Sequence, residues 1–237
     1  MNLPKFNDLW QQTTQWQPNQ TQQLLFDQLY TQIITTNKYL NLTRITTPEE
    51  FWEKNLWDSL APILPYDFNN KNIIDIGTGG GFPGVPSAIA FPSGNFTLMD
   101  STRKKINFIV QLTTALKLNN IKTLVDRAEN IGQNKQYRNK FDFALIRAVA
   151  ETSVCLEYTL PLLKKNGTAI LYRGNWTSAE ENHSKKIAQQ LGGEIEKISN
   201  QNTPINNNIR HCIYVKKTHN TPNQYPREVG KPVKQPL

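Results

Sequence analysis

The sequence contains only two cysteines, Cys155 and Cys212, and only three histidines. Neither cysteine belongs to a Cys-x-x-Cys pair and the histidines are scattered, so the sequence offers no disulfide framework, thiol redox centre or metal cluster. No apolar run approaches the roughly 20 residues that cross a bilayer. The first residues, MNLPKFNDLW, also lack the basic start and apolar stretch of a signal peptide. We therefore expect a cytoplasmic protein that has no membrane segment and binds no metal.

Acidic residues are scarce relative to basic ones: 19 Asp and Glu stand against 27 Lys and Arg, a net charge of +8. The first 60 residues carry four basic and six acidic groups, so the excess lies in the rest of the chain, including six basic groups and one acid from Arg210 onward. A basic surface attracts polyanions such as nucleic acid. A basic tail alone is weak evidence, because such tails also occur in proteins that bind no nucleic acid.

The length of 237 residues allows one α/β domain with an appendage, but is short for two domains with large cores of their own. Residues 1–65 are rich in Gln, Thr and Asn and are predicted to be helical. One predicted helix face carries Leu24, Leu25, Gln28, Leu29 and Ile33. The segment NKYLNLTRI is expected to be a loop, and Thr47 before Pro48 predicts the start of a further helix.

From residue 72 onward, short apolar runs alternate with helical stretches. The runs are NIIDI, FTLMD, TLVD, FDFALI and TAILYR, and helices are expected near 84–91, 102–118, 151–164 and 179–191. This alternation predicts an α/β core over residues 66–217, with a doubly wound, mostly parallel sheet covered on both faces. IEKISN and RHCIYVKK are expected to form an antiparallel edge hairpin, and the tail, residues 218–237, is expected to be loosely ordered.

The glycine-rich segment NIIDIGTGGGFPG, residues 72–84, is the strongest motif. A strand that ends at Ile76 and is followed by Gly77 predicts a tight turn whose bare backbone can lie against a ligand. No lysine follows the glycines, which excludes a nucleoside triphosphate loop, and the literal Gly-x-Gly-x-x-Gly match starts too late for a dinucleotide turn. The alternative is a glycine-rich turn that binds nothing.

Polar residues follow the next three strands, where ligands bind in doubly wound folds. Asp100 ends the second strand and could bind ribose hydroxyls, or it could cap the next helix together with Ser101 and Thr102. Ala128 and Glu129 follow the third strand, either beside a bound base or as a simple helix start. Arg147 ends the fourth strand, where its guanidinium could bind an acidic group or form a structural ion pair.

Together with their flanks, these residues resemble the bacterial 16S ribosomal RNA guanine-N7 methyltransferases, formerly called the glucose-inhibited division protein B family. The resemblance covers most of the chain and includes the segments NLTRI, LWDSL, IDIGTGGGFPGVPSAIAFP, TLMDSTRKKINFI, RAEN, FDFALIRAVA, LYRG and YPREVGKPVKQPL. The GFPG-VP segment, the Asp-Ser pair before a basic helix and the ending are specific to this family rather than to methyltransferases in general.

The resemblance implies a class I fold that binds S-adenosylmethionine as methyl donor. The residues implied to contact it are Gly77, Phe82, Asp100, Ser101, Thr102, Ala128, Glu129 and Arg147. It also implies that the acceptor is N7 of the guanine at nucleotide 527 of 16S rRNA, as RNA or in the small ribosomal subunit. Because guanine N7 keeps a free lone pair at neutral pH, we expect transfer by positioning without a general base, and we expect a monomer. Asn55 and Arg173 depart from the family pattern, which often has histidine and lysine at these positions. Three alternatives remain: a methyltransferase with another acceptor, a noncatalytic RNA-binding protein that keeps the cofactor fold, and a nicotinamide dehydrogenase.

Overall fold

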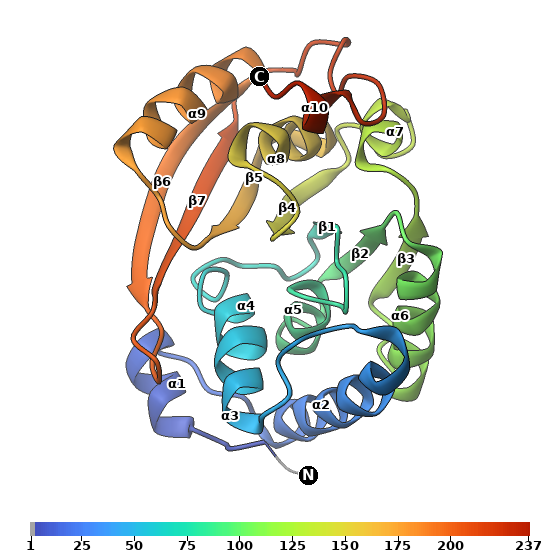
Figure 1. Ribbon diagram of the computed structural model, residues 1–237, viewed down its shortest axis with the longest axis vertical. Helices are drawn as coiled ribbons and strands as arrows, with labels where there is room; N and C mark the ends of the chain where they lie inside the picture. Colours follow the sequence, from blue (N-terminus) through green and yellow to red (C-terminus); the bar gives the residue numbers. More distant parts are fainter. Residues whose placement is uncertain (1–2) are drawn as a thin grey trace.

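The computed structural model describes residues 3–237 and places the predicted apolar runs in one seven-stranded sheet (Figure 1). The strands are β1 (Asn72–Ile76), β2 (Asn95–Asp100), β3 (Ile121–Val125), β4 (Phe141–Arg147), β5 (Leu163–Arg173), β6 (Gly193–Asn202) and β7 (Ile209–Lys217). Their order across the sheet is β3-β2-β1-β4-β5-β7-β6. Neighbours among β1 to β5 pair in parallel, while β7 pairs antiparallel with β5 and β6. The doubly wound, mostly parallel sheet with an edge hairpin is therefore confirmed.

Each face of the sheet has its own apolar core, because successive strand residues point to opposite faces. Ile73 belongs to one core cluster, whereas Ile74 and Ile76 belong to the other. The first face is covered by α5 (Gly84–Ala90) and α6 (Arg103–Ala115), and the second by α7 (Ala128–Gln133), α8 (Thr152–Thr159) and α9 (Ser178–Gln190) (Figure 1). Helix α8 is shorter than the predicted 151–164. It is followed by a 3-10 turn, η2 (Leu160–Leu162), because Pro161 cannot donate the next helical hydrogen bond.

The N-terminal region is helical, as predicted, and packs on the same face as α5 and α6. It comprises α1 (Asn7–Thr14), α2 (Gln20–Leu40), α3 (Pro48–Phe51), the π-helical segment η1 (Trp52–Trp57) and α4 (Asp58–Leu60). The prediction for the face of α2 was partly wrong: Leu29 and Ile33 are buried, but Leu24 is 58% exposed and Phe26 is buried. The loop predicted for NKYLNLTRI begins later than expected, because α2 continues through Asn37 to Leu40.

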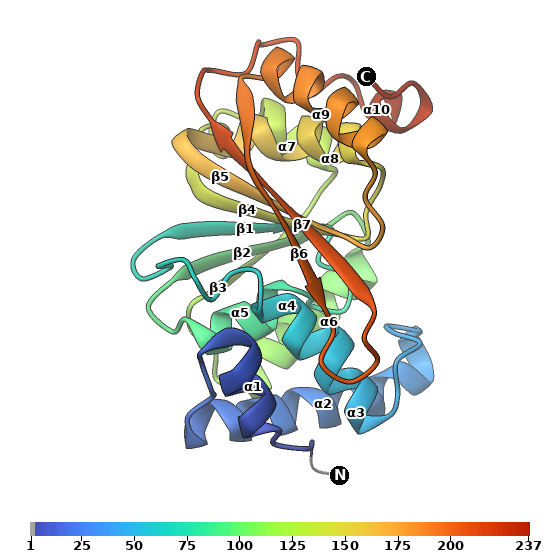
Figure 2. The ribbon, with the colours of Figure 1, turned by 90° about the vertical axis from the view of Figure 1, so that its left-hand side faces the viewer.

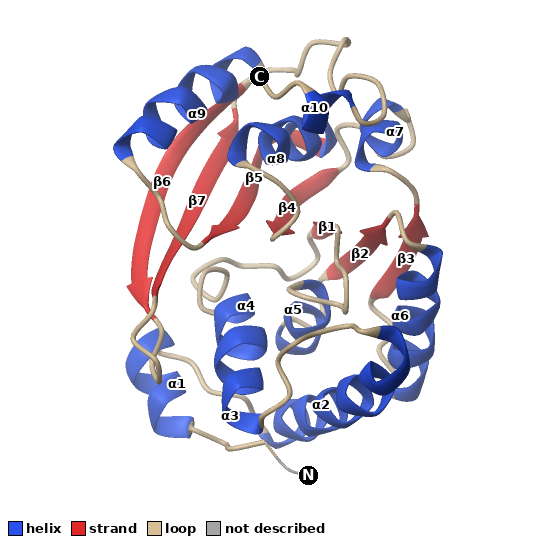
Figure 3. Cartoon of the chain, viewed as in Figure 1, coloured by secondary structure: helices blue, strands red, loops and turns tan. Residues whose placement is uncertain are grey.

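The tail, residues 218–237, lies packed on the core, unlike the loose order expected from its composition. Thr221 and Tyr225 are buried. The Arg138 guanidinium donates hydrogen bonds to carbonyl oxygens of both residues, at 2.8 and 2.7 Å. The tail ends in a short helix, α10 (Lys231–Lys234), that lies against α8 (Figure 3). The composition of the tail could not show this packing, because the residues that hold the tail lie elsewhere in the chain.

Two absences hold for the part of the chain that the structure describes. None of its helices is both long and apolar enough to cross a membrane. Within the same residues, no group of three or more His, Cys, Asp or Glu side chains is placed to hold a metal ion. Cys155 and Cys212 are both buried free thiols.

Candidate functional site

Two clefts lie where the parallel strands end, on either side of the loop that follows β4. The first is lined by residues after β1, β2 and β3, with Val149 and Ala150 on its β4 side. The second is lined by Arg147 and Ala148 together with residues of η1, α4, β5 and β7. Consecutive residues after β4 therefore face two different clefts, so molecules bound in the two would meet at this loop.

Gly77, the first residue of the glycine loop after β1, lines the first cleft. Gly77 has φ +70°, a left-handed conformation that glycine adopts without strain. A Cβ atom at this position would lie 2.5 Å from Cγ2 of Val149, so the loops after β1 and β4 touch because residue 77 has no side chain. The N–H of Thr78 donates to the carbonyl oxygen of Met99 at 2.9 Å, which holds the loop against the end of β2.

Asp100 joins the glycine loop to the start of α6. One carboxylate oxygen accepts the N–H of Gly79 at 3.1 Å, and the other accepts the N–H of Thr102 at 2.8 Å. Lys105 lies 3.7 Å from the same carboxylate, whose residue is only 6% exposed. Asp100 therefore caps the start of α6, as one of the two interpretations predicts. The residue also lines the first cleft, next to Ser101.

Glu129 lies in the turn after β3 and is 2% exposed. Its Oε1 accepts hydrogen bonds from the Arg127 guanidinium, the Tyr158 hydroxyl and the N–H of Gly230, at 3.0, 3.0 and 2.9 Å. Burial raises the pKa of Glu129, but these hydrogen bonds outweigh it and hold the pKa below its usual value. The buried Oε2 has no hydrogen-bond partner within residues 3–237. The site therefore holds a charged carboxylate with one oxygen left for a donor on a ligand.

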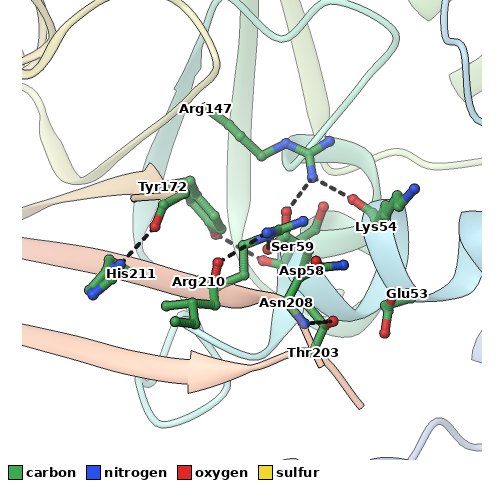
Figure 4. A network of polar contacts seen from close by, with 12 residues as sticks. Glu53, Lys54, Asp58, Ser59, Arg147, Tyr172, Thr203, Asn208, Arg210 and His211 are labelled. Atoms are coloured by element: carbon green, nitrogen blue, oxygen red, sulfur yellow. Dashed lines mark hydrogen bonds and ion pairs between the residues drawn. The ribbon is translucent and has the colours of Figure 1, made fainter. Parts of the chain in front are cut away.

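The second cleft is basic. Its lining includes Lys54, Arg147, Arg173 and Arg210 against a single acid, Asp58. Asp58 binds Arg147 through one oxygen at 3.2 Å and Arg210 through the other at 3.3 Å (Figure 4). Arg147 also donates to the carbonyl oxygen of Lys54 at 2.9 Å. The ion-pair alternative for Arg147 therefore holds in this structure.

The tip of the β6–β7 hairpin reaches the N-terminal helices (Figure 2), and Arg210 of β7 lines the second cleft. The buried Glu53 carboxylate accepts the N–H groups of Ile205 and Asn206 at 2.6 and 2.8 Å. Burial raises the pKa of Glu53, yet these bonds and the Asn206 amide hold it below its usual value. Asn55, on the same helical segment, is buried with its Nδ2 unpartnered among the described residues.

Five of the eight predicted site residues line the first cleft: Gly77, Asp100, Ser101, Ala128 and Glu129. Thr102 lies behind Asp100, to which its N–H is bonded. The buried Phe82 packs against Phe51, and Arg147 lies over its ring at 5.6 Å, so these two predicted residues meet beside the second cleft.

Sequence reasoning missed lining residues whose partners are distant in the chain. Tyr158 and Val233 line the first cleft, and Asp58 and Arg210 the second. Asp58 lies within LWDSL, and Val233 lies within the YPREVGKPVKQPL ending. Both segments indicated the family resemblance but did not show where their residues lie in the fold.

The sequence and structure are similar to those of methyltransferases. Residues 22–211 match the family model described as rRNA small subunit methyltransferase G. The chain is 53% identical over 240 residues to the ribosomal RNA small subunit methyltransferase G of Nostoc punctiforme, covering 99% of this chain and 98% of that protein. It is 52% identical over 241 residues to the protein of the same name from Trichormus variabilis, with the same coverage. A solved SAM-dependent methyltransferase from Aquifex aeolicus superposes with a TM-score of 0.53 at 15% identity, covering 71% of this chain and 93% of that one, a likeness of fold alone.

Proposed function

Because the chain belongs to the rRNA small subunit methyltransferase G family, we propose that it transfers a methyl group from S-adenosylmethionine to N7 of a guanine in 16S rRNA, at nucleotide 527. The observation that carries this proposal is the pair of clefts that meet at the loop after β4. One cleft suits a nucleoside and the other a polyanion, and methyl transfer needs a donor and an acceptor that meet at one point. We further propose that the enzyme acts in the cytoplasm as a monomer.

The first cleft has the properties that the methyl donor requires. Asp100 and Ser101 would bind the ribose hydroxyls, and Ala128 and Glu129 would lie beside the adenine, where the unpartnered Oε2 of Glu129 would accept a donor. The methionine end would lie beside Gly77, on the side where Phe82 and Arg147 meet. When bound, S-adenosylmethionine supplies an electrophilic methyl group on a sulfonium.

The second cleft suits the RNA. One arginine guanidinium can donate two parallel hydrogen bonds to two oxygens of a phosphate. Arg147, Arg173 and Arg210 come from the neighbouring strands β4, β5 and β7. Lys54 and Asn55 extend the surface into the N-terminal region, so residues 1–65 and the core, residues 66–217, would hold the RNA jointly. Affinity should fall steeply as the salt concentration rises, since each phosphate contact releases a counterion.

The reaction asks for positioning rather than proton transfer. Guanine N7 has a free lone pair at neutral pH, so no base needs to remove a proton from the attacking atom. The residues of the two clefts would hold N7 in line with the methyl group and exclude water, an effect that can lower a barrier by roughly 7–11 kcal/mol. Asp58, the one acid of the second cleft, is already paired with two arginines. This pairing suits a positioning role.

A radiolabel experiment separates this proposal from its alternatives. Purified protein and S-adenosylmethionine with a labelled methyl group would be incubated with small ribosomal subunits from cells that lack the gene. Label recovered as 7-methylguanosine at nucleotide 527 is the expected result. Cofactor binding without rRNA labelling would indicate another acceptor or a noncatalytic RNA-binding protein. Fluorescence quenching by a nicotinamide cofactor, without binding of S-adenosylmethionine, would indicate a dehydrogenase.

A further inference from the structure

We propose that the C-terminal strap, residues 225–234, is a wall of the cofactor cleft and that the N–H of Gly230 positions the Glu129 carboxylate that faces the ligand. This inference rests on the proposed use of the first cleft for S-adenosylmethionine. The ending YPREVGKPVKQPL would thereby have a role, although none of its residues takes part in the proposed methyl transfer.

The strap is held to α8 by an ion pair between Arg227, which is partly exposed, and Glu157. Glu157 is fully buried, and its two oxygens accept four hydrogen bonds from Arg227. The backbone N–H of Arg227 donates at 2.7 Å and Nη2 of its guanidinium at 2.7 Å. A buried carboxylate that lost these donors would destabilise the folded protein. This geometry fixes the strap at a point one residue from Tyr158, which lines the cofactor cleft.

The strap is also packed closely against α7, the helix that begins with Ala128 and Glu129. A Cβ atom at Gly132 would lie 2.5 Å from Cγ of Pro226, so the backbone of α7 and the strap are in direct contact. The Gln133 amide donates to the carbonyl oxygen of Pro226 at 2.7 Å. Helix α7 therefore holds its position partly through the strap.

One residue of the strap, Val233, lines the cleft, and another, Gly230, bonds to the lining residue Glu129. Gly230 has φ +82° and donates its N–H to Oε1 of Glu129 at 2.9 Å, the same oxygen that Tyr158 and Arg127 bind. Three donors on Oε1 leave Oε2 as the free acceptor. Val233 lines the cleft, yet 54% of its surface is exposed. An apolar side chain exposed at the edge of a nucleoside cleft gains burial when a ligand covers it.

The chain offers a matched pair of variants. Val229 is also in the strap and is 53% exposed, but it does not line the cofactor cleft. Val233→Glu would place a charge at the wall of the cleft, whereas Val229→Glu would add the same charge a few residues away. A third variant that ends at Glu228 removes Gly230 and Val233 but keeps the Arg227–Glu157 ion pair. Thermal unfolding without ligand would show whether each variant is folded.

The test measures binding of S-adenosylhomocysteine and S-adenosylmethionine by titration calorimetry, together with KM and kcat on small subunits. We expect Val233→Glu and the truncation to raise the cofactor Kd and KM by about tenfold or more, with the KM for RNA and the kcat at saturating cofactor little changed. Val229→Glu should bind as the wild type does. Equal cofactor affinity in the wild type, the Val233→Glu variant and the truncated protein would overturn the role of the strap. Failure of the wild type to bind either ligand would instead overturn the proposed function.

Discussion

Asp58 and Arg147 bind each other at 3.2 Å although 89 positions separate them in the sequence. Their ion pair links the N-terminal helices to the end of β4, at the loop that the two clefts share. The other oxygen of Asp58 holds Arg210 at 3.3 Å. One carboxylate thus fixes the directions of two guanidinium groups that we assign to RNA binding.

Arg210→Ala should weaken RNA binding and leave cofactor binding unchanged, because Arg210 lines only the basic cleft. The loss of one phosphate contact should reduce the slope of log affinity against log salt by roughly 0.7 to 0.9. Filter binding to small subunits across a salt series measures this slope. Lys122→Ala, on the exposed side of β3, is the control that removes one charge elsewhere. Equal slopes for the two variants would contradict a direct contact at Arg210.

Gly77→Ala should lower both stability and cofactor affinity. The left-handed conformation costs an alanine roughly 1–2 kcal/mol, and the added Cβ would press on Val149 from 2.5 Å. Gly174→Ala is the matched control, since nothing lies within 4 Å of a Cβ there. Urea unfolding and calorimetry with S-adenosylhomocysteine measure the two effects. Similar cofactor affinity for the two variants would show that the loop does not approach the ligand.

The buried Asp75 of β1 should make stability depend on pH. Burial raises its pKa from 3.8 to about 6, although the N–H of Gly84 donates to it at 2.9 Å. A carboxyl with a raised folded-state pKa holds its proton longer in the folded protein, so stability falls as pH rises from about 4 to about 6. The shift of about two units, at about 1.4 kcal/mol each, corresponds to about 3 kcal/mol.

Asp75→Asn stays uncharged and should lose this dependence. Urea unfolding of both proteins at pH 4, 5, 6 and 7 gives the difference in their free energies of unfolding. That difference should move in favour of the asparagine variant up to about pH 6 and then level off. A difference that stayed constant from pH 4 to pH 7 would mean that the pKa of Asp75 is not raised in the folded protein.

The parts of the molecule that depend on local pattern could be predicted from the sequence. The five parallel strands follow apolar runs bounded by turn residues, and the glycine turn follows from the absence of side chains at Gly77 and its neighbours. The position of Asp100 at the carboxyl end of β2 follows from the strand itself. Residues placed by such local rules line the first cleft.

The parts that depend on distant pairing could not be predicted. Nothing near Arg147 indicates that its partner is Asp58, and nothing in the tail indicates that Arg227 meets a fully buried Glu157. The wrong prediction for α2 has another origin: its buried residues, Phe26, Leu29, Tyr30 and Ile33, follow the helical period, and Leu24 lies outside that face. The composition of the tail likewise gave no indication that Val233 reaches the first cleft.

Asp58→Asn distinguishes positioning from base catalysis at the second cleft. Asparagine has nearly the same shape but no charge, so it should hold Arg147 and Arg210 less firmly and raise the KM for small subunits. If no base is needed, kcat at saturating RNA and cofactor should stay within about tenfold of the wild type. Loss of a general base would instead lower kcat by roughly 10²–10⁴. Single-turnover rates from pH 6 to 9 give a second measure, and we expect a flat profile. A kcat loss of that size with cofactor and RNA affinities intact would refute catalysis by positioning and make Asp58 the base.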